Sequence, residues 1–261
     1  MSKPRKLSTA SILSLCALIV LIGFGAYQYM MAKSEVTADE FGARVRAYLL
    51  ANPQVLREVF AELTKQENAA AERDRKERVA ALSEDLRNDG FSFVAGNPDG
   101  DVTIVEFFDY RCGYCKRSFP DLMKTVEEDG NIRLVLKEFP VLGPESVLAA
   151  QAAIAAAGQD KYMELHRAMM SVRGGLTLER ILNMATDVGI DTEKLQTDME
   201  SEETRAVIEK NYRLAKILDI QGTPAFVIGD EFVPGAISHT DMLKFVAAAR
   251  EKPAPAAGSE S

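Results

Sequence analysis

The sequence predicts an α/β domain whose core is divided by a long helical insertion. Three observations support this fold class. The apolar runs VTIVEFF (102–108) and NIRLVLKEF (131–139) flank a helix-like segment, which is the strand–helix–strand order of a parallel pair. A block of helix-like patterns follows from 145 to about 218. The runs TPAFVIG and EFVPG then predict a hairpin ahead of a closing helix.

The composition narrows the class of protein. With 261 residues, the chain is long enough for one medium domain with extensions. Hydrophobic residues make up 47% of it and charged residues 27%, so a packed core is expected. The formal charge of −8 argues against a nucleic-acid binder, because such proteins carry basic surfaces. The two histidines leave few ligands for a metal site.

The N-terminus has the features of an export signal. Its first residues, MSKPRK, are basic, and no residue from Leu7 to Ala32 is charged. A bilayer-spanning helix needs about 20 apolar residues, whereas the apolar part of a signal peptide has about 7–15. Residues 1–33 therefore predict a signal peptide or an uncleaved signal-anchor. The second is favoured because no small-x-small cleavage site follows, and residues 7–32 would then anchor the exported chain to the inner membrane.

Residues 37–88 predict a helical stalk. Apolar side chains recur there at the spacing of one helix face: Phe41, Val45, Tyr48 and Leu49. A second helix from Pro53 to Asn88 would be about 50 Å long and could not bury its apolar positions against itself. We expect such positions to pair identical copies of the chain into a homo-oligomer, such as a trimer. The alternative is a spacer without partners.

The remaining residues divide into a domain and a tail. Residues 91–250 predict the globular catalytic domain, with the insertion at about 145–218 between its two groups of strands. Residues 251–261 are rich in Pro, Ala and Ser, a composition that is typical of disorder. We therefore expect a single packed core, preceded by the stalk.

Two of the three cysteines, Cys112 and Cys115, lie in VEFFDYRCGYCKRSF, between a predicted strand and a predicted helix. The third, Cys16, lies in the N-terminal apolar run, so any disulfide within the exported part must join the close pair. A Cys-x-x-Cys at the start of a helix, in a strand–helix–strand context, is the thioredoxin-like redox arrangement. The helix N-terminus would stabilise the first thiolate, which is the nucleophile.

The spacing of the pair also suits the second half of a redox reaction. The second thiol lies one turn along, within reach of a mixed disulfide formed on the first. A copper or zinc site and a structural clip are the alternatives. A zinc site needs about four ligands, and only two thiols and two distant histidines are present. We therefore predict a redox pair with no metal and no cofactor.

A second motif lies far along the chain, in QGTPAFVIG. It places Thr223-Pro224 directly before the penultimate predicted strand. Thioredoxin-like folds carry an X-Pro bond in cis opposite the reactive thiol, and proline is the only residue for which a cis bond is cheap. The backbone of this loop could then pair with an extended substrate segment beside the cysteines.

The chain resembles the DsbA-like thiol:disulfide oxidoreductases of the bacterial envelope in VEFFDYRCGYC, in its Ala-rich insertion and in IQGTPAFVIGDEFVPGA. The segment RVRAYLLANPQVLREVFAELTKQ resembles the N-terminal oligomerisation helices of the ScsC-like (suppressor of copper sensitivity) branch. The resemblance implies a thioredoxin-like fold with an inserted all-helical subdomain, preceded by a helical stalk. It implies Cys112 as nucleophile, Cys115 as resolving thiol and Thr223-Pro224 as the cis-Pro loop. Glu106 matches the family's acidic residue beneath the active site, which would relay protons to Cys115.

The residues between the cysteines bear on the direction of the reaction. The strongest oxidases of the family have Pro and His there, whereas this chain has Gly113 and Tyr114. Because Tyr carries no positive charge, we expect a less oxidising pair. Gly-Tyr, with Thr before the cis-Pro, resembles the disulfide isomerases. We therefore expect a periplasmic isomerase or reductase that acts on misfolded exported proteins and is recharged by a DsbD- or ScsB-like membrane reductase.

Two other functions would use the same cysteines. A DsbA-type oxidase would insert disulfides and would be recharged by a DsbB-like, quinone-linked partner. A copper-binding or copper-tolerance protein would use Cys112 and Cys115 as soft ligands. The sequence leaves both alternatives open.

Overall fold

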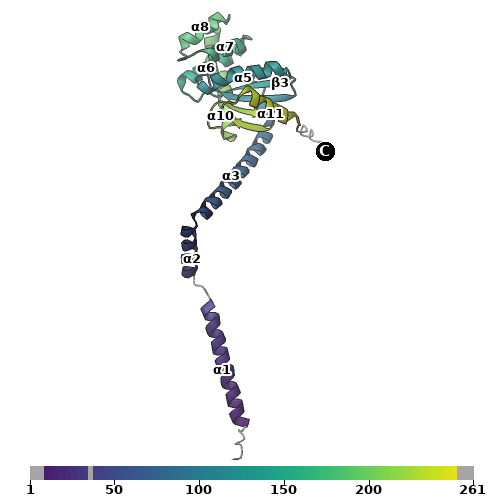
Figure 1. Cartoon of the computed structure of the whole chain (residues 1–261). Helices are drawn as coiled ribbons and strands as arrows, with labels where there is room; N and C mark the ends of the chain where they lie inside the picture. Colours follow the sequence, from purple (N-terminus) through teal and green to yellow (C-terminus); the bar gives the residue numbers. More distant parts are fainter. Residues whose placement is uncertain (1–8, 35–37, 252–261) are drawn as a thin grey trace, which may run out of the picture. The chain divides into compact units, whose positions relative to one another are not determined.

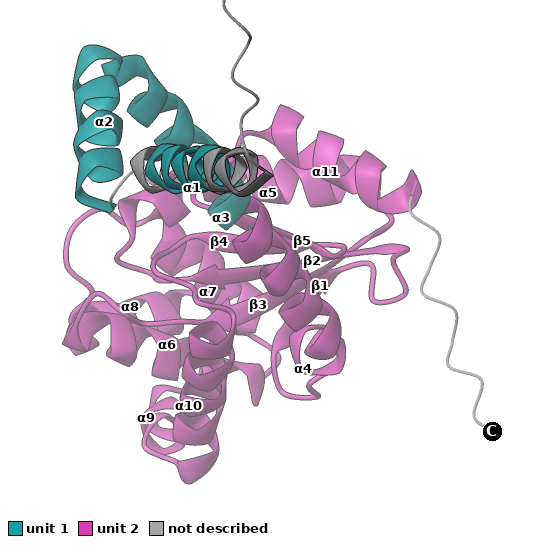
Figure 2. Cartoon of the chain, turned by 90° about the horizontal axis from the view of Figure 1, so that it is seen from below, with its two compact units in different colours: residues 1–68 teal, residues 69–261 magenta. Residues whose placement is uncertain are grey.

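The structure, a computed structural model, describes residues 9–34 and 38–251. The tail expected at 251–261 lies, from residue 252 onward, outside the described residues. Contacts between Cα atoms divide the chain into two compact units, residues 1–68 and residues 69–261 (Figure 2). The boundary falls inside one long helix, Pro53–Ala81.

The first unit is helical (Figure 1). It contains α1 (Thr9–Ser34), α2 (Ala38–Ala51) and the beginning of α3 (Pro53–Ala81). None of the helices in the described part of the chain combines the length and the apolar character that crossing a bilayer requires. The membrane anchor expected at residues 7–32 stays a prediction.

Apolar side chains are exposed along α2 and the beginning of α3. Besides Leu50, they are Phe41, Val45, Tyr48, Leu56, Val59, Phe60 and Leu63. We call this set the stalk stripe. The sequence predicts one apolar helix face at four positions, and three of them, Phe41, Val45 and Tyr48, belong to the stalk stripe. The stripe has no cover within its own unit, because every member is at least 40% exposed.

Within residues 69–251, five strands form one mixed sheet in the order β1-β3-β2-β4-β5. The strands are β1 (Phe93–Gly96), β2 (Val102–Phe108), β3 (Ile132–Glu138), β4 (Ala225–Ile228) and β5 (Glu231–Pro234). β2 and β3 run parallel, with Val102 beside Ile132, and the other neighbouring pairs are antiparallel. β1 is a strand that the sequence patterns did not predict. The predicted parallel pair and the predicted hairpin are both present.

Helices cover both faces of this sheet, which explains why β2 and β3 are apolar along almost their whole length. One face packs against α5 (Gly113–Asp129) and α11 (His239–Glu251). The opposite face packs against α4 (Ser83–Arg87), the end of α3 and α10 (Glu202–Ile217). Adjacent residues on β2 divide between them, since Ile104 belongs to the first core and Val105 to the second.

The helical insertion spans α6 (Pro144–Ala157), α7 (Tyr162–Ser171), α8 (Leu178–Asp187), α9 (Thr192–Met199) and α10. The alanines of α6 are buried and let neighbouring helices approach closely: Ala149, Ala152, Ala153 and Ala156. α10 has a second role, because its Leu214 packs on the sheet with Val135. The architecture is the expected thioredoxin-like fold with inserted helices.

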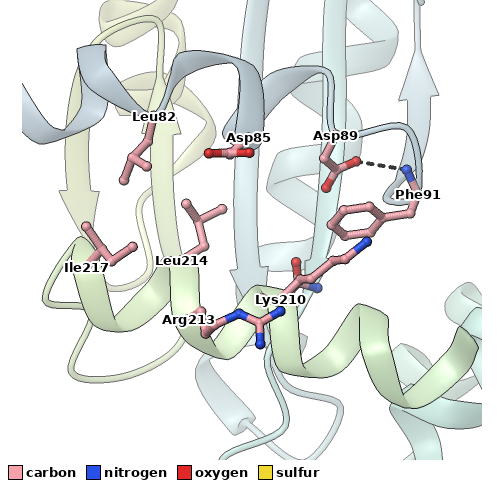
Figure 3. A pocket seen from close by; sticks show the side chains of 9 residues that line it. Leu82, Asp85, Asp89, Phe91, Lys210, Arg213, Leu214 and Ile217 are labelled. Carbon is pink, nitrogen blue, oxygen red and sulfur yellow. Dashed lines mark hydrogen bonds between the residues drawn. The ribbon is translucent and has the colours of Figure 1, made fainter. Parts of the chain in front are cut away.

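A cavity of about 420 Å³ lies between α10 and the segment that joins α4 to β1 (Figure 3). Leu82, Leu214 and Ile217 form its apolar side, and Lys210 and Arg213 lie at its rim. Asp89 accepts a hydrogen bond from the backbone N–H of Phe91 at 3.0 Å and forms a buried ion pair with Lys137. Because the Asp89 carboxylate binds groups of the protein itself, it fixes the segment that leads from α4 into β1.

Candidate active site

The two cysteines lie at the first turn of α5, directly after β2. Cys112 is the N-cap residue, and its Sγ accepts a hydrogen bond from the backbone N–H of Cys115 at 3.3 Å. This places the sulfur at the positive end of the helix dipole. Cys112 is 5% exposed, whereas Cys115 is completely buried. Only the first sulfur is therefore open to another molecule.

The loop before β4 lies against the first cysteine. The Thr223-Pro224 peptide bond is cis. The Sγ atom of Cys112 lies 3.2 Å from the carbonyl oxygen of Thr223, to which it donates when it is protonated. The strand pairing accounts for this meeting, because Ala225 at the start of β4 lies opposite Phe107 near the end of β2. The sequence motifs around the cysteines and the proline thus form one site.

Electrostatics favour the ionised form of the first cysteine. Its pKa is lowered to about 5, mainly by a hydrogen bond from the Cys115 thiol. The side chain of Thr223 and the backbone N–H groups of Cys115 and Tyr114 lower it further, and burial opposes them. At neutral pH, Cys112 is therefore a thiolate, which is the reactive form of cysteine.

The pKa values of Cys115 and Glu106 are raised, whereas that of Cys112 is lowered. Burial raises the pKa of Cys115 far above its usual range, and its hydrogen bond to Cys112 and the charge of Glu106 raise it further. Glu106 on β2 is fully buried, and neither of its carboxyl oxygens has a hydrogen-bond partner among the described residues. Burial, followed by the charge of Cys112, raises its pKa to about 8. Glu106 therefore holds a proton at neutral pH.

Asp109 organises the turn that precedes the first cysteine, a role that the sequence analysis missed. Its Oδ1 accepts hydrogen bonds from the N–H of Arg111 at 2.7 Å and from the hydroxyl of Ser146 at 2.8 Å. Its Oδ2 accepts from the N–H groups of Val141 and Leu142 at 2.8 and 2.9 Å. The carboxylate is 1% exposed and joins the turn to the start of α6. An acidic residue directly after a buried strand was the available signal.

A buried polar cluster connects the same turn to the insertion. The hydroxyl of Tyr110 lies 3.1 Å from Oε1 of Glu138 and 2.8 Å from Nδ1 of His166. The hydroxyl of Tyr162 donates to the same carboxyl oxygen at 2.7 Å. Burial lowers the pKa of His166 to about 3, so this ring is neutral. Hydrogen bonds between these buried side chains therefore connect α7 to the active-site turn.

The two residues between the cysteines face outward. Tyr114 is 62% exposed, and the guanidinium of Arg117 lies 4.3 Å from the centre of its ring. A Cβ atom on Gly113 would come within 3.4 Å of that guanidinium. A Cβ atom at position 113 would therefore touch the guanidinium at an ordinary van der Waals distance.

The predicted site residues come together in the structure: Glu106, Cys112, Gly113, Tyr114, Cys115, Thr223 and Pro224. A pocket of about 580 Å³ adjoins them and is lined by Tyr114, Thr223 and Pro224. Its wall also includes Arg75 of α3, which the sequence analysis did not connect with the site.

Family models and solved structures of known proteins are similar to this chain. The DSBA-like thioredoxin domain matches residues 103–247, and the copper resistance protein ScsC N-terminal domain matches residues 39–70. A thioredoxin-like oxidoreductase from Silicibacter pomeroyi DSS-3 is 44% identical, with a TM-score of 0.64 over 65% of this chain and 98% of that chain. The catalytic domain of Proteus mirabilis ScsC is 30% identical, with a TM-score of 0.64 over 68% and 99%.

Among curated proteins, the Na(+)/H(+) antiporter NhaA 1 of Salinispora arenicola is 27% identical over 137 residues. That match covers 52% of this chain and 21% of the antiporter. The chain thus spans about a fifth of the length of that relative, and about a quarter of its mycobacterial counterparts. Because the DSBA match alone spans more than half of it, the chain belongs to the family of DSBA-like thioredoxin domains, thiol–disulfide oxidoreductases of the DsbA and ScsC type.

Proposed function

We propose that this chain is a disulfide isomerase or reductase that corrects wrong disulfides in exported proteins. One observation supports the proposal most directly: Cys112, whose pKa is about 5, contacts the cis Thr223-Pro224 loop. A thiolate in this position attacks a disulfide without needing a separate base. The cis-Pro loop beside it is the proposed support for an extended substrate segment.

The reaction begins with attack of the Cys112 thiolate on one sulfur of a substrate disulfide. The substrate S–S bond breaks, a mixed disulfide forms, and the second substrate sulfur leaves as a thiolate that takes a proton from water. In isomerisation, a substrate thiolate then attacks the mixed disulfide or another pair, and Cys112 is released unchanged. No net electrons are transferred in this cycle.

In reduction, Cys115 completes the cycle. Its thiol loses a proton, and its sulfur attacks Sγ of Cys112. The bond between Cys112 and the substrate breaks, and the substrate sulfur that was bonded to Cys112 leaves as a thiolate. The substrate gains two electrons, and the enzyme is left with a Cys112–Cys115 disulfide, which a membrane reductase of the DsbD or ScsB type would reduce again. Glu106 is the proposed proton acceptor. Forming the mixed disulfide removes the Cys112 charge, the smaller of the two causes that raise the Glu106 pKa, which lowers the cost of ionising Glu106 before it takes the Cys115 proton.

Three features favour correction of disulfides over their formation. No cationic residue stands between the cysteines, and Arg117 is held over the Tyr114 ring. A Cys112 pKa of about 5 lies above the value of about 3.5 found for the strongest oxidant of this class. A less stabilised thiolate lowers the oxidising power of the disulfide form.

The stalk stripe supports a homo-oligomer. Exposed apolar side chains on amphipathic helices gain stability by packing against identical copies. We propose that residues 37–88 form the oligomerisation stalk and that residues 91–250 form the catalytic domain in the periplasm. Several active sites on one assembly would hold a misfolded substrate by multivalency.

The reduction potential of the purified chain tests the direction. We expect a value of about −180 to −270 mV, together with reactivation of scrambled ribonuclease. A value near −120 mV, combined with fast oxidation of reduced dithiols and no reactivation, would instead identify a DsbA-type oxidase.

A copper-binding role is the second candidate, because two sulfurs lie together and the matched N-terminal domain is named for copper resistance. Across residues 9–34 and 38–251, no group of three or more His, Cys, Asp or Glu side chains could hold a metal ion. Copper titration of the chain and of Cys112→Ser tests this candidate. Tight stoichiometric binding that needs Cys112, without turnover of disulfides, would favour it over the enzyme.

A further inference from the structure

We propose that Arg75 of α3 makes the site selective for substrates that carry an acidic side chain close in sequence to their disulfide. This inference rests on the proposed function and names its substrate class. It gives a residue outside the thioredoxin-like sheet a direct part in recognition. The observations concern the pocket beside the cis-Pro loop.

This pocket adjoins the reactive cysteine through two of its lining residues, Tyr114 and Thr223. Its lining residues come from four places: α3, the first turn of α5, the cis-Pro loop, and β5 with the residues that follow it. They include Arg75, Tyr114, Thr223, Pro224, Phe232 and Pro234. Because Thr223 contacts the sulfur of Cys112, a segment disulfide-linked to that sulfur lies next to this lining.

Most of the lining is apolar and carries no charge. Phe232 is 8% exposed, so its ring forms part of the pocket wall rather than a free surface. Asp219 is the lining residue with a negative charge, and its carboxylate already accepts a hydrogen bond from the Gln221 side chain at 2.5 Å. Arg75 is therefore the positively charged residue of the lining, and its guanidinium is the group there that attracts a carboxylate.

Arg75 is held at the pocket by the packing of α3. Its guanidinium carbon lies 4.8 Å from the centre of the Phe232 ring. In the next turn of the helix, Val79 is completely buried, and the neighbouring Lys76 forms an ion pair with Glu231 at 3.1 Å. These contacts fix the helix against β5 and give Arg75 a defined position.

The hydrogen-bonding capacity of Arg75 is not fully used. Its Nη1 forms an ion pair with Glu72 of the same helix at 3.7 Å, a distance too long for a hydrogen bond to that carboxylate. Its Nε is buried and has no hydrogen-bond partner among the described residues. A planar guanidinium binds a carboxylate through two parallel N–H donors, so an Asp or Glu side chain of the substrate fits this position. A substrate lysine placed there would be repelled.

Disulfide-linked peptides that differ at one position test the proposal. One set carries Glu, Gln or Lys at each of the three positions on either side of the cysteine, and kcat/KM for reduction is measured with the full chain. We expect Glu to be preferred over Lys by about 3–10-fold at one or more positions, since partly exposed ion pairs contribute modestly. The preference should shrink as salt is added.

Two variants of the same helix sharpen the test. Arg75→Glu should invert the Glu-to-Lys ratio at the same positions, because the charge in the pocket is reversed. Arg73→Glu is the matched control, since Arg73 is exposed, lies on the same helix and does not line the pocket. It should keep the preference of the unaltered chain. An identical ratio in Arg75→Glu and the unaltered chain would overturn the proposal.

Binding without chemistry separates this inference from the proposed function. Peptides in which serine replaces the cysteine cannot be reduced, so their dissociation constants, from fluorescence anisotropy, report recognition alone. A Glu preference that Arg75→Glu inverts, in a chain that reduces no disulfide peptide, would support the inference and overturn the function. Turnover of all peptides at equal rates and with equal affinities would overturn the inference and leave the function standing.

Discussion

The Sγ atom of Cys112 lies 3.2 Å from the carbonyl oxygen of Thr223, although 111 positions separate the two residues in the chain. The pairing of β2 with β4 brings them together across the helical insertion. The sulfur thus meets a helix N-terminus on one side and a cis-Pro loop on the other. This relationship underlies the first two predictions.

The first prediction concerns the ionisation of Cys112. The rate of its alkylation by iodoacetamide should rise with pH, with a midpoint at about pH 5, because only the thiolate reacts. Above about pH 7 the rate should no longer change. Cys115→Ala should shift the midpoint upward, since it removes the hydrogen bond that lowers the pKa most. Cys115→Ser keeps a hydroxyl donor and should shift it less. A midpoint at about pH 8.5 in the unaltered chain, the value of an unperturbed cysteine, would contradict the proposed role of Cys112 as nucleophile.

The second prediction concerns proton transfer by Glu106. Glu106→Gln should slow the release of substrate from the mixed disulfide by about 10–100-fold, because Gln cannot accept the Cys115 proton. Attack by Cys112 should change much less. Single-turnover kinetics with a fluorescent disulfide peptide separate the two steps. Equal slowing of both steps would show that Glu106 acts on the thiolate and not on the resolving thiol.

Glu106 should also make the stability of the reduced protein depend on pH. Its pKa is raised from 4.5 to about 8 in the folded chain, so its protonated form is favoured there. This contribution is complete below about pH 4.5 and is lost as the pH rises to about 8. Glu106→Gln should therefore raise the free energy of unfolding by about 2–4 kcal/mol at about pH 8.5 and change it little at about pH 4.5. Urea unfolding at both pH values measures the difference, and an equal effect at both would contradict the raised pKa.

The third prediction concerns the anchoring of the active-site turn. Asp109→Asn should destabilise the chain by about 2–4 kcal/mol, because an amide cannot accept all four hydrogen bonds made to this buried carboxylate. Ser146→Ala removes one of these donors and should cost about 1 kcal/mol. The Asp109 variant should also change the alkylation midpoint of Cys112, while Ser146→Ala should leave it nearly in place. Equal effects of the two variants would contradict this organising role.

The fourth prediction concerns the stalk stripe. Phe60→Glu places a charge among exposed apolar side chains and should convert the oligomer to a monomer in light scattering. Lys65→Glu, at an exposed position on the same helix, is the control and should keep the native mass. A monomeric unaltered chain would remove the multivalent part of the proposed function.

Some features of the fold could be predicted because their signals are local. β2 and β3 are buried on both faces, so their runs are almost continuously apolar and stand out in the sequence. The pair Cys112 and Cys115, and Thr223-Pro224, carry chemistry that few other residues can supply. β1, by contrast, has four residues of intermediate or high exposure and no clear alternation, so its pattern is too weak to detect.

Other site residues could not be predicted because their partners are distant in sequence. Asp109 is an ordinary acidic residue until Ser146 and the backbone at 141–142 surround it. Arg75 lies in a run of many charged residues, and nothing local distinguishes it from its exposed neighbour Arg73. The packing of α3 on β5 alone turns one of them toward the pocket.

The sequence by itself therefore determined the two motifs, the strands that hold them and the family resemblance, because these depend on residue type and short spacing. Tertiary structure decided how low the pKa of Cys112 falls, how high that of Glu106 rises, and which charged side chain lines the pocket. The physical reason is that burial and long-range hydrogen bonds change the energy of a charge far more than the neighbouring residues in the chain do.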